Sequence, residues 1–542
     1  MKIIPFSLCI GLTSLTSLAL LGPLACAGSK ENASTIGSAG SGTPPIVSGS
    51  GGAGTVTYAG GGGTGSVDIF TPTGGAPPAA GNQCSPGNTT KISGIVRDPA
   101  GKNPLYNISV FVLDPASPLP DLEKIPVSCG CAQLLPEKVL AIGAPTDASG
   151  HFEIPCAPSG PVTLVVQTGK WRRKYENVNV VANQDNVITD LRLPANSSEG
   201  SLPNIAISTG GSDSFECLPL RIGVSASEYV AGSATGGHIH IYSGLRGATP
   251  AQGAVDSYKA LWDSQAHLNE HDVVILSCEG AETSNGPISA MGGPRPGQAQ
   301  SGPPLTETEQ NYLVNYVNGG GRVFASHYQY AWFSSGPFNT GANRLATWGP
   351  GTIGTGPGAD TDAEYMAEIN TTLSTNAPFP GGTALATWLG IVGALRNNQL
   401  PVRYVRNNAS MLRQPPATEW IHLAADVSNA ASAPQYFSAD TPIGAPDGKV
   451  CGRVVYSALH VSGGPGKSPT ALAKDADYPA APADGAAGGR GMMTGGQAPA
   501  GIAPSGCAIR ELTPQEKALE FMFFDLSSCL VPIGEEPPVI PK

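Results

Sequence analysis

The sequence predicts a multidomain protein in which an all-β sandwich is followed by a larger α/β domain with a parallel sheet. Short alternating strands between turns predict the sandwich over residues 88–197. Continuous apolar strands on either side of an amphipathic helix predict the α/β domain over residues 202–530. A stretch of Gly, Ser, Thr, Ala and Pro predicts that residues 26–87 form a disordered tether, because this composition cannot bury enough apolar surface to fold. Residues 531–542 form a tail.

The N-terminal segment, residues 1–25, has the pattern of a signal peptide. Lys2 is followed by an apolar stretch over residues 3–21 and a short cleavage region, which predicts export and not a membrane span. The Leu-Ala-Cys sequence that ends at Cys26 resembles a lipoprotein cleavage box, in which this cysteine becomes the lipidated first residue. Ordinary cleavage after Ala27 is the alternative. Both predict an exported protein of the outer membrane, cell surface or periplasm, and lipidation would anchor it to the membrane.

The composition argues against nucleic acid as a partner and for long loops. The chain has 30 basic and 41 acidic residues and a net charge of -11, and its longest basic cluster is the short group over residues 170–174. Its 71 glycines and 50 prolines exceed what compact domains need. We expect long insertions at about residues 333–445, as an irregular region, and at about 464–505, as a loop.

The cysteines predict disulfides, which fit an oxidising compartment. Cys129 and Cys131 form a Cys-x-Cys pair that lacks a second pair at zinc-site spacing, so we expect them to bond to Cys84 and Cys156. We also expect Cys451 and Cys507, near the two ends of the loop 464–505, to join these ends. The cysteines expected in disulfides are Cys84, Cys129, Cys131, Cys156, Cys217, Cys451, Cys507 and Cys529. With Cys278 the count beyond the signal region is odd, so at least one cysteine is unpaired or pairs outside the chain.

Two turn motifs mark the sandwich. Residues 94–101 read Gly-Ile-Val-Arg-Asp-Pro-Ala-Gly, and residues 146–152 read Thr-Asp-Ala-Ser-Gly-His-Phe. In both, Asp caps the turn and Gly takes a positive φ, and in the second Phe152 returns to the core. These motifs resemble a carboxypeptidase regulatory-like domain. The resemblance implies a prealbumin-like sandwich that serves as a spacer or binding module without catalytic residues, with residues 113–139 as an insertion.

The α/β elements follow from apolar runs and caps. Residues 271–276 and 322–326 read as buried strands on either side of a helix that a capping box opens at Thr306. Residues 452–460 read as a further strand, and a second capping box at Thr513 opens a final helix. The apolar side chains expected to line one face of this last helix are Leu519, Met522, Phe523 and Leu526.

Three segments of this domain, residues 272–276, 316–327 and 452–460, resemble the ThuA-like branch of the class I glutamine amidotransferase-like fold. The resemblance implies a flavodoxin-like sheet and a sugar-related role. The chain departs from the amidotransferases in one respect. The turn after the strand 322–326 holds His327 where those enzymes place a nucleophilic cysteine, so we do not expect glutamine hydrolysis.

Three side chains that could take part in catalysis follow predicted parallel strands. They are Cys278, His327 and His460. Ligands of open parallel sheets bind beyond the carboxyl ends of the strands, so we expect these residues to converge and regard them as the catalytic candidates. A thiolate at Cys278 beside a histidine would be a nucleophile. A buried or disulfide-bonded cysteine is the alternative.

His238 and His240 alternate along an apolar segment and therefore point to one face if it is a strand. Together with His327 or His460 they could bind a divalent metal. The alternative is a hydrogen-bonded pair at a strand edge, because the nearest carboxylates, such as Glu228, lack ligand-like spacing. We expect no other cofactor.

These observations favour an exported envelope lipoprotein with a non-catalytic role in binding envelope carbohydrate or protein. The alternative is a periplasmic or surface enzyme that acts on a sugar derivative through its strand-end histidines, with or without a metal. A third interpretation is a surface assembly component. The sequence contains no Gly-x-Ser-x-Gly, His-Glu-x-x-His or phosphate-loop motif.

Overall fold

The computed structural model describes residues 87–210, 213–244, 256–279, 305–349, 364–403, 405–424, 433–446, 448–461, 507 and 509–540. All of them belong to one unit, Pro72–Lys542. The predicted signal peptide, Cys26, Cys84 and the loop 464–505 lie outside the described residues. Of the predicted tether, only Gly87 is described. No helix among the described residues is long and apolar enough to cross a membrane.

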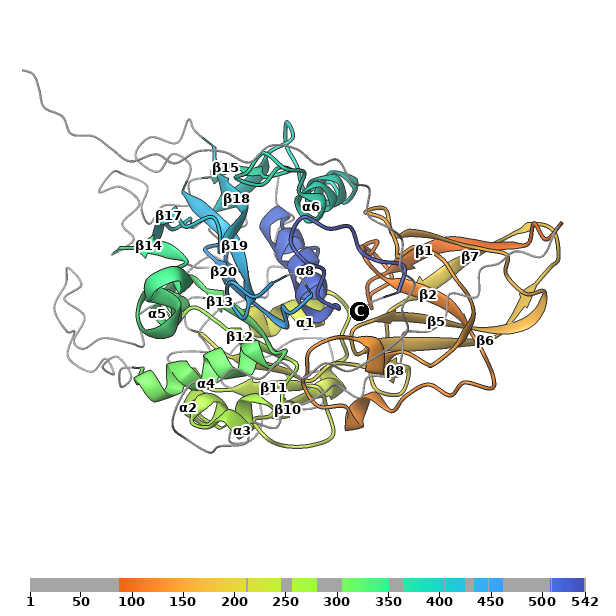
Figure 1. Cartoon of the computed structure of the whole chain (residues 1–542), viewed down its shortest axis with the longest axis horizontal. Coiled ribbons are helices and arrows are strands. Elements are labelled where there is room, and N and C mark those ends of the chain that lie inside the picture. The colour runs from red at the N-terminus through yellow and green to blue at the C-terminus, as the bar shows by residue number, and fades with distance from the viewer. Residues whose placement is uncertain are drawn as a thin grey trace, which may run out of the picture. The chain divides into compact units, whose positions relative to one another are not determined.

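The N-terminal part of the described chain forms two sheets (Figure 1). The three-stranded sheet has the order β4-β1-β7, with bounds His151–Pro155, Lys91–Arg97 and Asp185–Arg192. The five-stranded sheet has the order β3-β2-β5-β6-β8, with bounds Val139–Ile142, Ser109–Leu113, Gly160–Thr168, Trp171–Val180 and Gly200–Ser201. Apolar side chains of both sheets, such as Ile92 and Val110, lie in one hydrophobic core.

The two turn motifs adopt the predicted chemistry. The Asp147 Oδ1 accepts hydrogen bonds from the backbone N–H of Ser149 at 2.8 Å and of His151 at 3.1 Å. Gly150 has a φ of 74°, and a Cβ there would lie 2.7 Å from the Val96 carbonyl oxygen. The turn therefore needs glycine for both its conformation and its packing.

The second part is built around a ten-stranded sheet with the order β10-β11-β9-β12-β13-β20-β19-β18-β15-β16. The first six strands pair in parallel, with bounds Tyr229–Ala231, Ile239–Tyr242, Ile205–Ser208, Val273–Leu276, Arg322–Ser326 and Gly452–Ser457. The predicted strands 322–326 and 452–460 are confirmed, although the second ends at Ser457. The predicted strand 271–276 starts two residues later than expected, at Val273.

The segment 333–445 is more ordered than expected for an insertion. Four strands within it extend the sheet in antiparallel fashion: β19 (Pro434–Thr441), β18 (Thr418–Leu423), β15 (Glu364–Ile369) and β16 (Leu400–Arg403). A separate two-stranded sheet pairs β14 (Ala346–Trp348) with β17 (Ala409–Leu412). The expectation of a long irregular region was therefore wrong, because short strands between Gly- and Pro-rich turns give weak periodicity that only cross-strand pairing stabilises.

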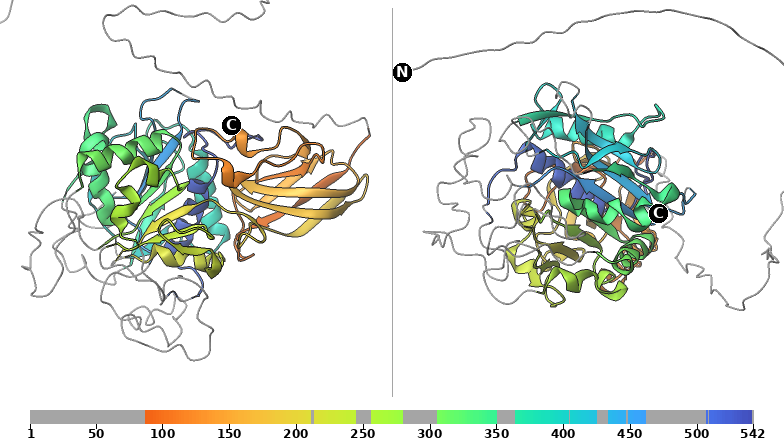
Figure 2. Two further views of the ribbon diagram at one scale, coloured as in Figure 1. Left: turned by 90° about the horizontal axis from the view of Figure 1, so that it is seen from below. Right: turned by 90° about the vertical axis from the view of Figure 1, so that its left-hand side faces the viewer.

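Helices cover both faces of the parallel strands (Figure 2). Alternate strand residues point to opposite faces, so Val274 and Val323 share a core with α4 (Glu307–Asn318), whereas Ile275 and Phe324 share the other core with α8 (Pro514–Ser527). Both predicted capping boxes are present. The other α-helices in the part of the chain that the structure describes are α1 (Leu218–Arg221), α2 (Tyr258–Trp262), α3 (Gln265–Leu268), α5 (Ala331–Ser334) and α6 (Pro380–Ile391).

Helix α8 lies between the ten-stranded sheet and the sandwich (Figure 1). The apolar stripe in the sequence predicted burial of one face of this helix. In the structure, α8 is buried nearly all round. The Trp171 ring of β6 contacts the rings of Phe523 and Phe524 with centroid distances of 6.4 and 5.8 Å. The Trp388 Nε1 of α6 donates to the Pro104 carbonyl oxygen at 2.6 Å. The two parts of the chain thus share one hydrophobic core.

Disulfides fasten the insertion 113–139 to the α/β part. Cys129 bonds to Cys451, and Cys131 bonds to Cys529. The expected pairings were wrong, because the insertion lies against the α/β part and not across its own sandwich. The third described disulfide joins Cys217 to Cys507, so the expected clip of the loop 464–505 by Cys451 and Cys507 is also wrong. Cys156 is also disulfide-bonded.

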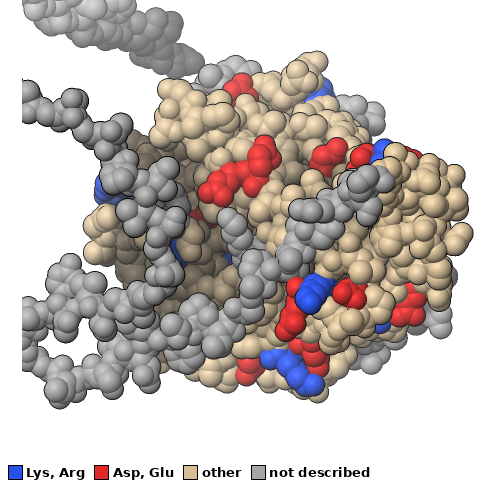
Figure 3. Space-filling model, turned by 45° about the vertical axis from the view of Figure 1, so that its right-hand side comes forward, with Lys and Arg blue, Asp and Glu red and all other residues tan. Residues whose placement is uncertain are grey.

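Charged side chains on the face shown in Figure 3 are scattered and form no large basic patch there. Among the described residues, several basic side chains form ion pairs within the chain. Lys170, from the short basic cluster of the sequence, pairs with Asp272 at 2.8 Å, and Arg173 pairs with Glu199 at 3.0 Å. These basic side chains serve contacts within the fold.

Candidate functional site

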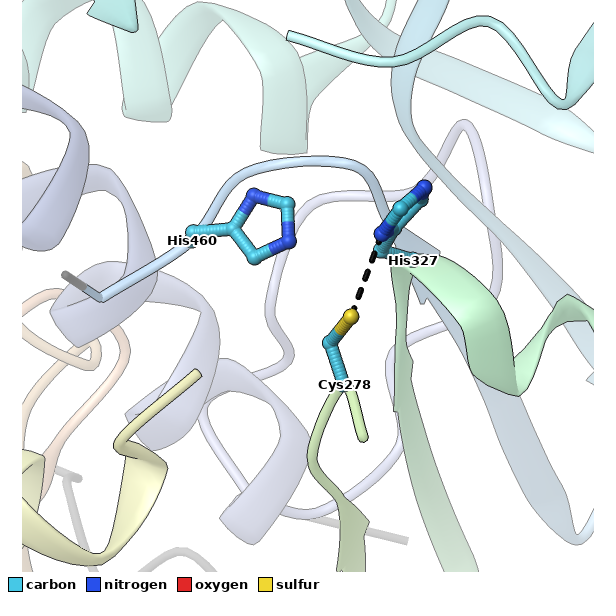
Figure 4. Close-up of side chains that lie close together, drawn as sticks. All are labelled: Cys278, His327 and His460. Carbon is cyan, nitrogen blue, oxygen red and sulfur yellow. Dashed lines mark hydrogen bonds between the residues drawn. The ribbon is translucent and has the colours of Figure 1, made fainter. Parts of the chain in front are cut away.

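The carboxyl ends of β12, β13 and β20 bring Cys278, His327 and His460 together (Figure 4). Leu276 lies opposite Ala325 in the parallel pairing of β12 and β13, so the chain reaches Cys278 and His327 side by side, two residues further along each strand. His460 follows β20, which pairs with the other side of β13. The expected convergence at one edge of the sheet is therefore present.

The three side chains form a compact buried group. The Cys278 Sγ lies 3.1 Å from the His327 Nδ1, and the rings of His327 and His460 have a centroid distance of 5.2 Å and an interplanar angle of 73°. One potential ligand atom from each residue lies within 4.8 Å of the others. Cys278 is not in a disulfide and is 0 % exposed, and both histidines are 2 % exposed.

The turn that carries His327 is strained and held by its neighbours. His327 has a φ of 37°, in the left-handed region that a β-carbon disfavours, and begins a short 3-10 helix over His327–Tyr330. Such a conformation costs about 1–3 kcal/mol and persists only where surrounding contacts fix it. One such contact runs from the Gln329 Nε2 to the Ser277 carbonyl oxygen at 3.0 Å, which ties the turn to the end of β12.

Asp213 connects the two histidine-bearing turns. Its Oδ2 accepts a hydrogen bond from the Ser326 Oγ at 2.5 Å, and its Oδ1 accepts one from the Val461 backbone N–H at 2.8 Å. Ser326 immediately precedes His327, and Val461 immediately follows His460. The sequence patterns did not single out Asp213, because the short strand β9 before it was not recognised. An acidic residue close after a parallel strand was the signal that could have found it.

The electrostatics favour a neutral His327 at this site. Burial lowers the pKa of His327 well below its usual range, and the charges of His460 and Arg406 lower it further. The side chain of Asn408 lies close enough to raise the pKa of His327. Its Oδ1 does not, however, form a hydrogen bond of good geometry. Burial raises the pKa of Asp213 to about 7, against the effect of its hydrogen bonds. Arg406 and Asn408 were missed because they lie in the segment that was expected to be irregular.

His238 and His240 lie at the opposite, amino-terminal edge of the parallel sheet. His238 immediately precedes β11, and its Nδ1 and Nε2 contact the carboxylates of Glu228 at 2.6 Å and Glu123 at 3.2 Å. The His240 Nδ1 contacts the Gly232 carbonyl oxygen at 2.7 Å. The structure therefore does not bring this pair to His327 or His460, because the start of one parallel strand lies far from the ends of the others. The contacts of His238 and His240 instead fit the alternative interpretation, in which the two histidines are hydrogen-bonded.

A cavity of about 630 Å³ lies between the insertion 113–139 and the α/β part. Its lining includes the Cys129–Cys451 and Cys131–Cys529 disulfides, Lys170 and Asp272. None of Cys278, His327 and His460 lines it. The cavity and the Cys-His-His group are thus separate features.

The donor set of the Cys-His-His group suits a borderline transition metal such as zinc. In tetrahedral zinc sites the sulfur and nitrogen ligands lie about 3.5 Å apart, given zinc bonds of about 2.3 and 2.0–2.1 Å. The Cys278 Sγ and His327 Nδ1 are 3.1 Å apart, so this pair would open slightly around a zinc ion, and the three ligand atoms lie within 4.8 Å of one another. Three protein ligands leave a fourth position for water or substrate.

The sequence matches no protein-family model and no curated protein. A ThuA-like protein from Bacteroides uniformis is a structural neighbour, with 12% identity and a TM-score of 0.25 over 48% of this chain and 81% of that one. Two interface mutants of a type II cohesin–X-dockerin complex from Acetivibrio cellulolyticus also match. The C-terminal mutant has 16% identity and a TM-score of 0.14 over 23% of this chain and 78% of that one. The N-terminal mutant has 15% identity and a TM-score of 0.15 over 28% and 88%. These TM-scores are too low to carry an argument about function.

Proposed function

We propose that this chain is an exported envelope enzyme whose α/β domain holds a zinc-type metal ion at Cys278, His327 and His460. The observation that carries the proposal is the placement of one thiol and two imidazoles, each at most 2 % exposed, with their ligand atoms within 4.8 Å of one another. The order of five parallel strands, β11-β9-β12-β13-β20, supports a flavodoxin-like sheet, whose ligand crevice lies at the carboxyl ends of the strands.

Metal binding accounts for this site better than a thiol nucleophile does. Metal ligation needs neutral imidazoles, and burial favours the neutral form of His327 by lowering its pKa. A thiolate–imidazolium pair would instead place two charges in a buried site. A zinc ion here would act as a Lewis acid and lower the pKa of a bound water.

The cellular setting and the substrate class have separate support. The signal-like N-terminus supports export and lipid anchoring at Cys26, and the three described disulfides are consistent with an oxidising compartment. A sugar derivative as substrate rests on the sequence resemblance to the ThuA-like branch alone.

Metal analysis of the mature protein, purified from the periplasm of an expression host, tests the proposal. After incubation with Zn²⁺ and desalting, the wild type should retain about one metal ion per chain, as a three-ligand site predicts. Cys278→Ser and His460→Ala should each lose most of it. His267→Ala is the control, because this partly exposed histidine pairs with Asp263 at 2.6 Å, away from the site. A wild-type protein that retains no zinc would refute the proposal.

A non-catalytic binding role is the second candidate, and the cavity of about 630 Å³ beside the two disulfides favours it. The ligand would be an envelope carbohydrate. Calorimetry with purified cell-wall glycan fragments tests this role, with Lys449→Glu as the variant, because Lys449 lines the cavity and is exposed. Equal binding by the wild type and this variant, or no binding by either, would count against the cavity as the site.

A further inference from the structure

We infer that Asp213 is the positioning residue that holds His327 and His460 at metal-ligand distance. The inference rests on the proposed metal centre and adds a residue that does not itself belong to the ligand set. Its basis is the pair of hydrogen bonds from one carboxylate to the residues next to the two histidines, Ser326 and Val461.

The two histidines come from different turns, after β13 and after β20. The strands themselves pair only as far as Ser326 and Ser457, so the pairing of the sheet does not extend to His327 and His460. Asp213 spans this gap, because its two carboxylate oxygens bind one turn each. A single side chain thereby sets the separation of the two turns.

Asp213 is itself well fixed. It is 1 % exposed and forms an isolated antiparallel bridge with Gly210, just beyond the end of β9. Four residues later, Cys217 is bonded to Cys507. The carboxylate therefore provides a rigid reference point, which a strained residue such as His327 with its φ of 37° needs to keep one conformation.

The chemistry of the two donors explains why a carboxylate suits this position. The Ser326 hydroxyl and the Val461 N–H both point at it, and both are buried, so losing the acceptor would leave two donors unsatisfied unless the turns moved. Asparagine could keep both contacts, because its oxygen can accept from Val461 while its amide donates to the Ser326 oxygen. Alanine could keep neither.

Titration of the purified mature protein with Co²⁺ and Zn²⁺ tests the inference. Asp213→Ala should bind both ions about 10–100-fold more weakly than the wild type, as expected when a residue that orients metal ligands is lost. The thiolate-to-cobalt absorption should weaken or shift, which a change in overall stability alone would not produce. Asp213→Asn should bind nearly as tightly as the wild type. Glu216→Gln is the matched control, because Glu216 is equally buried three residues away and should leave the affinity unchanged.

Each outcome has a distinct meaning. A wild type that binds neither ion overturns both the proposed metal centre and this inference. A wild type that binds while Asp213→Ala binds equally tightly overturns the inference alone. Equal losses of metal affinity in Asp213→Ala and Asp213→Asn overturn the inference that the hydrogen bonds of Asp213 hold the two turns together. If Asp213→Ala does not fold, Ser326→Ala removes only one of the two donors and should weaken binding by a smaller factor, and an unchanged affinity there also overturns the inference.

Discussion

The Cys278 Sγ lies 3.1 Å from the His327 Nδ1, although 49 residues separate them in the sequence. Parallel pairing produces this contact, because β12 and β13 are adjacent and end level with each other. The described part of the intervening chain includes α4, which lies on one face of the sheet and leads to the start of β13. The pairing of two adjacent parallel strands thus brings the thiol to the histidine.

The state of this thiol can be predicted directly. Alkylation of the native, unreduced protein should leave Cys278 unmodified, because it is 0 % exposed. In denaturant without reduction, it should be the one described cysteine that reacts, since the others are in disulfides. Peptide mass mapping measures the modified positions, and Cys278→Ser is the control. Modification of Cys129 or Cys451 without reductant would contradict the disulfide pattern.

Glu216 should contribute a fall in stability as the pH rises from about 5 to about 8. Burial raises the pKa of Glu216 to about 8, and the charge of Asp213 adds to the shift. In this window the unfolded chain releases the proton of Glu216 while the folded chain retains it, so the free energy of unfolding decreases with pH. Glu216→Gln should reduce this slope, whereas Glu137→Gln, at an exposed position, should not. Urea unfolding at several pH values measures the slope, and equal slopes in all three proteins would contradict the assignment.

The sandwich and the α/β part should unfold together. Trp171 is 0 % exposed and contacts Phe523 and Phe524 of α8, so Trp171→Ala should lower the free energy of unfolding by roughly 3–5 kcal/mol. Val187→Ala, at a side chain that is 63% exposed, is the control and should have little effect. Circular dichroism during urea unfolding should show one transition. Two separated transitions in the wild type would contradict a shared core.

The disulfide between the insertion and the C-terminal segment should stabilise this arrangement. Replacing both Cys131 and Cys529 by serine should lower the free energy of unfolding by about 2–4 kcal/mol, because the cross-link restricts the unfolded chain. The Cys129–Cys451 disulfide remains in this variant, so the insertion should stay attached. Urea unfolding without reductant measures the change. A stability equal to that of the wild type would show that this cross-link adds nothing to the other one.

Short sequence patterns predicted those helices and strands that are specified by residues close together in the chain. The capping boxes at Thr306 and Thr513 fix where α4 and α8 begin, because the hydrogen bonds that define them join residues three apart. The run of Val273 to Leu276 indicates a strand buried on both faces. By contrast, β9 and the strands of residues 333–445 are short and depend on their partners in the sheet, so the sequence marks them weakly.

The sequence by itself determined that a β-rich part precedes an α/β part, the chemistry of the two turn motifs, and the three side chains at the strand ends. Each of these depends on local spacing, on the rule that parallel strands end at one edge, or on family resemblance. Only the tertiary structure decided which cysteines are bonded, that α8 is shared by both parts, and that Asp213 joins the two histidine-bearing turns. These contacts link residues far apart in the chain, and their partners are selected by the packing of whole elements, which no short sequence pattern records.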